Sequence, residues 1–81
     1  MQATIDNVEL RSFENRNNKN NEPYGILNFE DEDYVSHRLM YKDMSLNEKL
    51  RNCRGKSAML IINIELGQYA NVMLLDVITN G

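Results

Sequence analysis

The sequence is poor in the residues on which catalytic, metal-binding and secreted proteins depend. Its 81 residues include one cysteine, one histidine, one proline and no tryptophan. A single cysteine cannot form an intramolecular disulfide, which favours a reducing compartment and a cytoplasmic protein. Cys53 and His37 cannot complete a zinc site alone, and their spacing does not suggest a nucleophile pair. There is no Gly-rich phosphate loop, so we expect no catalytic residue, no metal, no cofactor and no enzymatic activity.

Long hydrophobic runs are also missing. No stretch approaches the ~20 apolar residues that a spanning helix requires, and the first ten residues lack a basic segment followed by an apolar one. We therefore expect no membrane segment and no signal peptide. With 42% hydrophobic and 26% charged residues, the composition is that of one globular domain, residues 1–81. A chain this short has only just enough core, and dimerisation would bury more apolar surface.

Positive charge is in the minority, with nine Lys and Arg against 12 Asp and Glu, giving a net charge of -3. This balance argues mildly against a nucleic-acid partner. The charges are nevertheless segregated, because residues 38–56 carry six cations and two acids, a local charge of +4. The acidic excess gathers in Glu30–Asp33, which lacks the spacing of a calcium loop and is better explained as a solvated turn.

Most of the contiguous apolar surface lies in the last third of the chain. Two runs rich in Val, Ile, Leu and Met, AMLIINIEL and YANVMLLDVI, flank a tight Gly67-Gln68 step. Each run has about the length of one strand, so residues 56–78 are predicted to fold back as a β-hairpin that forms the core.

Three more strands are predicted earlier in the chain, over residues 3–13, 23–29 and 34–42. Between the first two lies ENRNNKNNE (residues 14–22), whose five Asn indicate a mobile loop or a protruding β-wing. Ser45 to Glu48 has the pattern of a capping box and predicts a short helix. Its apolar stripe is Leu46, Leu50 and Cys53, and Gly55 is its expected stop.

Alternation within the strands assigns side chains to faces. Ile5 and Val8 are out of phase, which predicts a bulge between them. Arg11 and Phe13 are expected on the face away from Val8 and Leu10.

In the third strand, alternation places Tyr34, Arg38 and Lys42 on one side and His37 and Tyr41 on the other.

Three strands, a short helix and two strands is the order of the OB-fold. We therefore predict an all-β protein with small α content, a five-stranded OB-fold-like barrel with one short helix between strands 3 and 4. A general five-stranded barrel and an α+β sheet remain open.

Aromatic rings interleaved with cations suggest single-stranded nucleic acid as a partner, because bases stack on rings while Lys and Arg follow the phosphates. Four tyrosines and no tryptophan suit half-exposed rings. The alternative is that each tyrosine simply packs in a strand, where tyrosine is common. Phe29 is expected in the core. The candidate nucleic-acid-binding residues are Arg11, Phe13, Arg16, Lys19, Tyr24, Tyr34, Arg38, Tyr41, Lys42 and Tyr69.

Three patches carry a resemblance to a known family: the polar segment 14–22, the Pro23-Tyr24 step that follows it, and residues 67–74, GQYANVML, with Asp76 shortly after. On these the chain resembles the gene-five-type single-stranded DNA-binding proteins of filamentous phages. The resemblance implies an OB-fold homodimer that coats replicating DNA. The family's basic residues after the hairpin Asp are here Val77 and Ile78.

For individual residues, the resemblance implies base stacking by Tyr24 and Tyr69 and phosphate contacts by Arg16 and Lys19. It also implies dimerisation through the last hairpin, for which the candidates are Gly67, Gln68, Val72, Met73 and Leu75. The expected function is sequence-nonspecific binding of single-stranded DNA, with RNA as the alternative partner, in replication of a phage or mobile element in a bacterial cytoplasm. The competing hypothesis is a small protein-binding module without nucleic-acid affinity, acting through the hairpin or the acidic turn.

Overall fold

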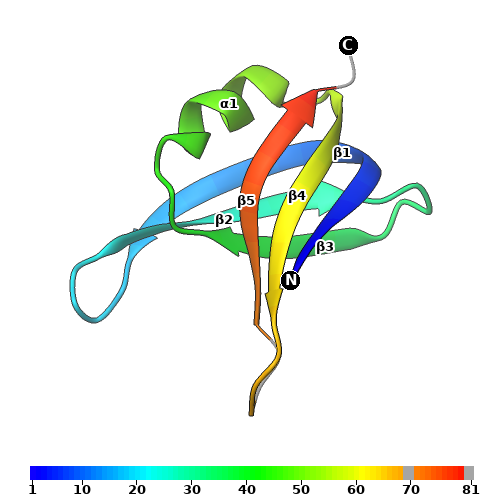
Figure 1. Cartoon of the computed structure of the whole chain (residues 1–81). Coiled ribbons are helices and arrows are strands. Elements are labelled where there is room, and N and C mark those ends of the chain that lie inside the picture. The colour runs from blue at the N-terminus through cyan, green and yellow to red at the C-terminus, as the bar shows by residue number, and fades with distance from the viewer. Residues whose placement is uncertain (69–70, 80–81) are drawn as a thin grey trace.

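The part of the chain that the structure describes forms five strands and one short helix (Figure 1). The computed structural model describes residues 1–68 and 71–79. The elements are β1 (Gln2–Asn17), β2 (Pro23–Glu30), β3 (Ser36–Tyr41), α1 (Leu46–Cys53), β4 (Ser57–Glu65) and β5 (Asn71–Thr79). The helix falls between the third and fourth strands, as predicted. Among the described residues, no helix has the length and apolarity needed to cross a membrane.

The strands close into a barrel in the order β1-β2-β3-β5-β4. Closure depends on β1, which is long enough to pair with β2 along its second half and with β4 along its first half. All pairs are antiparallel except β3 with β5, which meet in parallel at Met40 and Met73. The predicted OB-fold-like barrel is therefore confirmed, and the α+β alternative is wrong.

Two irregularities bend β1 around the barrel. The first lies between Ile5 and Val8, where Asn7 adopts a left-handed φ of 55°, and it confirms the predicted bulge. The second, between Leu10 and Ser12, was not predicted. Bulges let one strand serve two neighbours because each extra residue increases the local twist.

The second irregularity reverses which side chains of β1 face inward. Phe13 pairs with Leu27, whose side chain is buried, and the Phe13 ring packs against the core. The prediction that Phe13 faces away from Val8 and Leu10 is therefore wrong, because simple alternation fails across a bulge. Arg11 is exposed, as expected.

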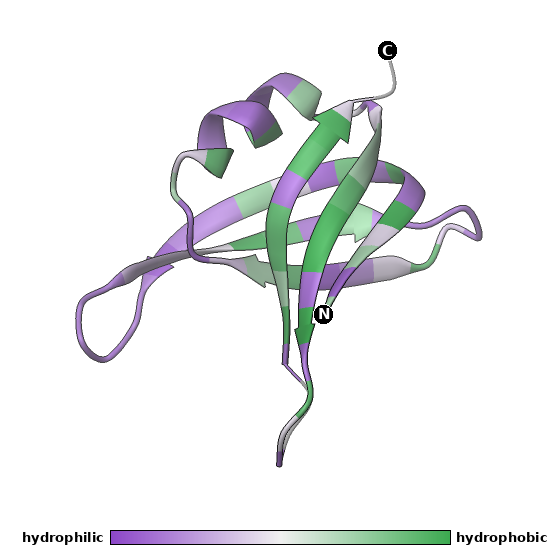
Figure 2. Cartoon of the chain, viewed as in Figure 1, coloured by the Kyte–Doolittle hydropathy of each residue, from purple (hydrophilic) through white to green (hydrophobic). Residues whose placement is uncertain are grey.

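The core fills the inside of the barrel and is closed at one end by α1. The hydropathy of the residues agrees with this arrangement (Figure 2). Apolar residues are concentrated on β4 and β5, and hydrophilic residues lie in the turn between β1 and β2. The hairpin supplies much of the core, but the other strands and the helix supply the rest, so it is not the core by itself. Phe29 is buried, as predicted. The buried cluster is Val8, Leu10, Leu27, Phe29, Leu39, Tyr41, Leu46, Leu50, Cys53, Ala58, Leu60, Ile62, Leu74 and Val77.

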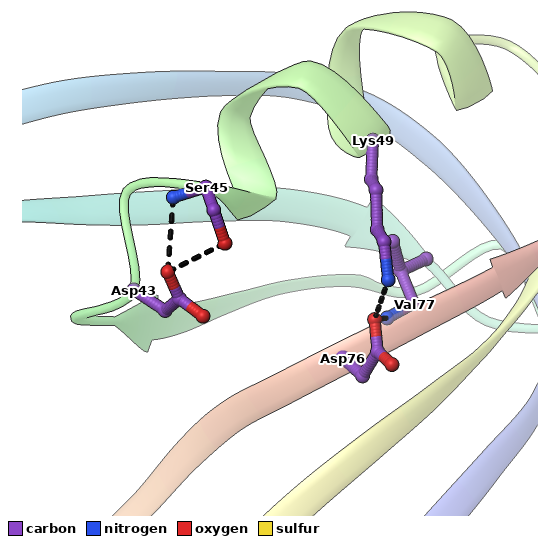
Figure 3. Close-up of polar contacts among 5 residues, drawn as sticks. All are labelled: Asp43, Ser45, Lys49, Asp76 and Val77. Atoms are coloured by element: carbon purple, nitrogen blue, oxygen red, sulfur yellow. Dashed lines mark hydrogen bonds and ion pairs between the residues drawn. The ribbon is translucent and has the colours of Figure 1, made fainter.

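The helix begins differently from the prediction. Ser45 makes no capping hydrogen bond to the helix; its amide and its hydroxyl both donate to Asp43 Oδ1, at 3.0 and 2.6 Å (Figure 3). These bonds lower the pKa of Asp43, with the Ser45 hydroxyl as the main cause. The capping box is therefore wrong, because a carboxylate two residues earlier competes for the serine.

The rest of the helix follows the prediction. Its predicted stripe, Leu46, Leu50 and Cys53, is buried. Gly55 ends it with a left-handed φ of 77°, the conformation that favours glycine. Lys49 Nζ donates to Asp76 Oδ1 at 2.8 Å and ties the helix to β5 (Figure 3).

The connections between strands differ in length from expectation. β1 and β2 stay paired out to Asn17 and Pro23, so the polar segment is a β-wing whose turn is residues 18–22. β3 begins at Ser36 rather than Tyr34, because the Asp31 carboxylate accepts bonds from the Asp33 and Val35 amides and holds a turn there. In the last hairpin, pairing ends at Glu65 and Asn71, so the connection is longer than a two-residue turn.

Candidate nucleic-acid interface

The outer wall formed by β1, β2 and β3 brings several predicted site residues together. Arg16 lies beside Tyr24 across the β1–β2 pair. Asn28 lies between Ser12 on β1 and Arg38 on β3. Tyr24 and Asn28 are four residues apart on β2 and therefore lie on the same face, and side chains at paired positions also share a face. Arg16, Tyr24 and Arg38 therefore point outward on one wall.

Two adjoining hollows make this wall concave. The first, of about 270 Å³, lies at the base of the wing, and the second, of about 160 Å³, lies between β3 and the β4–β5 hairpin. Lys42 lines both, so the two hollows adjoin at this side chain, and we call them together the furrow. The first is lined by Asn18, Glu22, Pro23, Tyr24, Met40 and Lys42. The second is lined by Lys42, Asn63, Glu65, Asn71 and Met73.

The furrow lies between two projecting segments. The wing and the β4–β5 hairpin both extend away from the barrel, whereas the turn between β2 and β3 lies on the side opposite the wing (Figure 1). In OB-folds, oligonucleotides bind on the face of the second and third strands, between the loops that join strands 1–2 and strands 4–5. The furrow occupies the corresponding position.

Charge in and around the furrow is mixed. Arg16 pairs with Glu14 at 2.9 Å, and both side chains are about half exposed. Glu22 and Glu65 contribute two acids to the lining. Within residues 1–68 and 71–79, neither Arg38 nor Lys42 forms an ion pair. Two cations beside the furrow are therefore available for a phosphate without breaking an existing ion pair.

Two other predicted rings, Tyr41 and Tyr34, do not join the furrow. Tyr41 is completely buried, so the prediction that it contacts nucleic acid is wrong. Its hydroxyl donates to Asn47 Oδ1 and accepts from Asn15 Nδ2, and burial raises the pKa of Tyr41. Tyr34 is 80% exposed, but it lies in the turn between β2 and β3. Tyr69 lies outside the described residues.

The other predicted cations are dispersed. Arg11 lies toward the far end of β2 from Tyr24, where its Nε donates to Glu30 at 2.7 Å and its guanidinium also pairs with Glu9 at 3.2 Å. The hydrogen bond to Glu30 is the main cause of the raised pKa of Arg11. Lys19 lies in the turn of the wing, exposed.

The residues predicted for a dimer interface divide between two surfaces. Gly67 and Gln68 are exposed in the segment after β4. Val72 and Leu75 are 39% and 37% exposed, respectively. Met73 instead lines the furrow, on the face of β5 opposite that of its neighbour Val72.

Sequence reasoning did not select Met40, which is 45% exposed and lines the first hollow of the furrow. The sequence did contain a signal for it: Met40 alternates with Arg38 and Lys42 in the third strand and therefore shares their face. Asn63 and Asn71 carried no signal, because only the closure of the barrel brings the last hairpin beside β3.

Comparison of the chain with protein-family models, with curated proteins and with solved structures finds no match.

Proposed function

We propose that this chain binds single-stranded DNA with little sequence preference, in the replication of a phage or mobile element in a bacterial cytoplasm. The observation that supports this proposal is the furrow, which places Tyr24 and Lys42 between the wing and the hairpin. Tyr24 also belongs to the Pro23-Tyr24 step, one of the patches on which the chain resembles the gene-five-type proteins.

Tyr24 is the ring best placed to stack on a base. It is partly buried, so part of its surface is held by the barrel and part is open to the furrow. Met40 lies beside it and offers a polarisable apolar surface that adapts to different bases. Stacking contributes ~1–3 kcal/mol per base and tolerates any sequence, since every base has a π-face.

Phosphate contacts would come from Lys42 in the furrow, from Arg16 and Arg38 on the wall beside it, and from Lys19 in the turn of the wing. Four such contacts give a slope of about -3 for log K against log salt on single strands. The net charge of -3 opposes the approach of DNA over longer distances. The phosphate contacts act at short range and release counterions, so we expect binding to weaken as salt is raised.

We include a homodimer in the proposal. Leu66 is 75% exposed just after β4 and Val72 is 39% exposed near the start of β5, so the hairpin offers apolar side chains that a second copy could bury. Sedimentation equilibrium of wild type and Leu66→Glu tests this. A monomeric wild type would contradict it.

The proposed function is tested by fluorescence anisotropy with labelled oligo(dT) at low and high salt. Tyr24→Ala should weaken binding by ~1–3 kcal/mol, roughly 5- to 150-fold. Tyr34→Ala is the matched control, because it removes the same side chain from an exposed turn outside the furrow. If Tyr24→Ala binds as tightly as wild type, the stacking mechanism is wrong.

The competing candidate, a protein-binding module, is favoured by one observation. A hollow of about 400 Å³ lies beside the acidic turn, away from the furrow, and Glu9, Glu32 and the exposed Tyr34 are among its lining residues. A basic segment of another protein would suit this surface. The anisotropy titration separates the two functions, because the module predicts no binding of oligo(dT) even at low salt.

A further inference from the structure

A third hollow, of about 390 Å³, lies between β1 and the C-terminal end of α1. It is lined by Ser12, Phe13, Arg51 and Arg54 and shares no residue with the furrow. Arg51 is in the last turn of the helix, and Arg54 is its C-cap residue. The hollow therefore combines an aromatic ring, a hydroxyl and two guanidinium groups.

The fold fixes both sides of this hollow. On the helix side, the Gly55 amide donates to the Leu10 carbonyl at 2.9 Å, so the end of α1 is attached to β1. On the strand side, the irregularity between Leu10 and Ser12 turns Phe13 toward the core, where its ring is only partly buried. The ring and the arginines are thus brought together by the bulge that sequence alternation missed.

The two arginines differ from the neighbouring cations in their ion pairing. Arg11 pairs with Glu30, and Lys49 pairs with Asp76. In the part of the chain that the structure describes, Arg51 and Arg54 form no ion pair. Cations near a helix C-terminus also offset the helix dipole, which is a purely structural role that a test must separate from binding.

The lining matches a phosphate group attached to a flat ring. Guanidinium groups bind phosphate oxygens through paired, charge-assisted hydrogen bonds. The Ser12 oxygen accepts from Asn28 Nδ2 at 3.1 Å, which leaves its own O–H free to donate. The Phe13 ring offers an apolar surface for a base.

We propose that this hollow is a second phosphate-binding site, which takes the phosphate and base of a nucleotide. The nucleotide can be free in solution or part of a nucleic-acid strand. The proposal does not depend on the furrow, since each site has its own residues and its own variants.

The experiment is a titration of the ¹⁵N-labelled full chain, followed by amide chemical shifts, with inorganic phosphate, thymidine 5′-monophosphate and oligo(dT) in separate arms. Saturable shifts are expected at residues 12–13 and 51–55 below about 10 mM nucleotide, where a millimolar site is mostly filled. Shifts with the monophosphate alone identify a free nucleotide. Shifts with oligo(dT), retained in Tyr24→Ala, identify a strand.

Single-charge variants separate binding from the structural role. Arg51→Gln and Arg54→Gln should each weaken nucleotide binding by about tenfold or more, the loss expected for a hydrogen bond to a charged group. Lys49→Gln is the matched control, because it removes one positive charge from the same helix at a residue outside the hollow's lining. Equal weakening by Lys49→Gln overturns the proposal in favour of general charge attraction. Arginine variants that lower the melting temperature but bind as wild type also overturn it, as does the absence of saturable shifts in every arm.

Discussion

Replacing Gly25 by alanine should be among the most damaging single-methyl changes in this barrel. Gly25 is buried on the inner face of β2 and pairs with Tyr41 on β3. A Cβ added there would overlap the far end of the Tyr41 ring, well inside van der Waals contact. The ring has no room to retreat, because it is completely buried and its hydroxyl is held by Asn47 and Asn15.

The magnitude follows from these contacts. Forcing an extra methyl group into a packed core costs ~1–3 kcal/mol. Displacing the ring also weakens the two hydrogen bonds of the Tyr41 hydroxyl, each worth ~0.5–1.5 kcal/mol. We expect Gly25→Ala to lower the free energy of unfolding by ~2–4 kcal/mol in total. A domain of this size has only about 4–12 kcal/mol in all, so much of its stability would be lost.

The assay is urea unfolding followed by far-UV circular dichroism, with thermal melts alongside. A loss of this size corresponds to a fall in melting temperature of roughly 10–25 °C. Gly67→Ala is the matched control, because a Cβ at Gly67 meets nothing within 4 Å. If Gly25→Ala unfolds at the same urea concentration as Gly67→Ala, the packing of Tyr41 over Gly25 is wrong.

Three further changes test other parts of the fold. Gly55→Ala should destabilise the chain by about 1–2 kcal/mol in urea unfolding, because alanine is strained at φ 77° although the space is open; no loss would contradict that conformation. Tyr41→Phe should cost ~1 kcal/mol through its lost bond to Asn47 and leave oligo(dT) affinity unchanged in anisotropy, whereas weaker binding would restore Tyr41 to the interface. The pKa of Asp31 is lowered, mainly by its hydrogen bond with His37, so its contribution to stability is present above its unfolded pKa of about 3.9 and is lost as pH falls through the lower folded value. His37→Ala should raise the folded pKa of Asp31 and move acid unfolding to higher pH, as carboxyl NMR titration can measure; an unchanged titration would refute the contact.

The architecture of the barrel was predictable because its signals are local. Strand periodicity, the apolar stripe of the helix and the position of Gly55 each depend on a few neighbouring residues. Their order along the chain then selected one known arrangement of five strands and a helix. The out-of-phase pair Ile5 and Val8 even placed the first bulge.

The errors come from interactions between segments far apart in the sequence. Alternation cannot show the second bulge, so Phe13 was assigned to the wrong face. Tyr41 is an ordinary strand tyrosine by sequence, and only the glycine opposite it on β2 creates the space that buries its ring. At the helix start, Ser45 donates its hydrogen bonds to the Asp43 carboxylate instead of capping the helix as the capping pattern had predicted.

The candidate site was predictable in part for the same reasons. Arg16 and Tyr24 flank one short turn, and Arg38 alternates with Lys42, so local reasoning grouped them correctly on one wall. The contribution of the last hairpin to the furrow requires the parallel pairing of Met40 with Met73, which joins β3 to β5 across the closed barrel. No local pattern specifies that contact.

The central claim, that single-stranded DNA lies in the furrow, is tested most directly by photocrosslinking oligo(dT) substituted with iodouracil and identifying the modified residues by mass spectrometry. Efficient crosslinking requires a base in contact with an aromatic ring, so the account predicts an adduct on Tyr24 that declines as salt is raised. Adducts confined to Tyr34, or none at low salt, would contradict it.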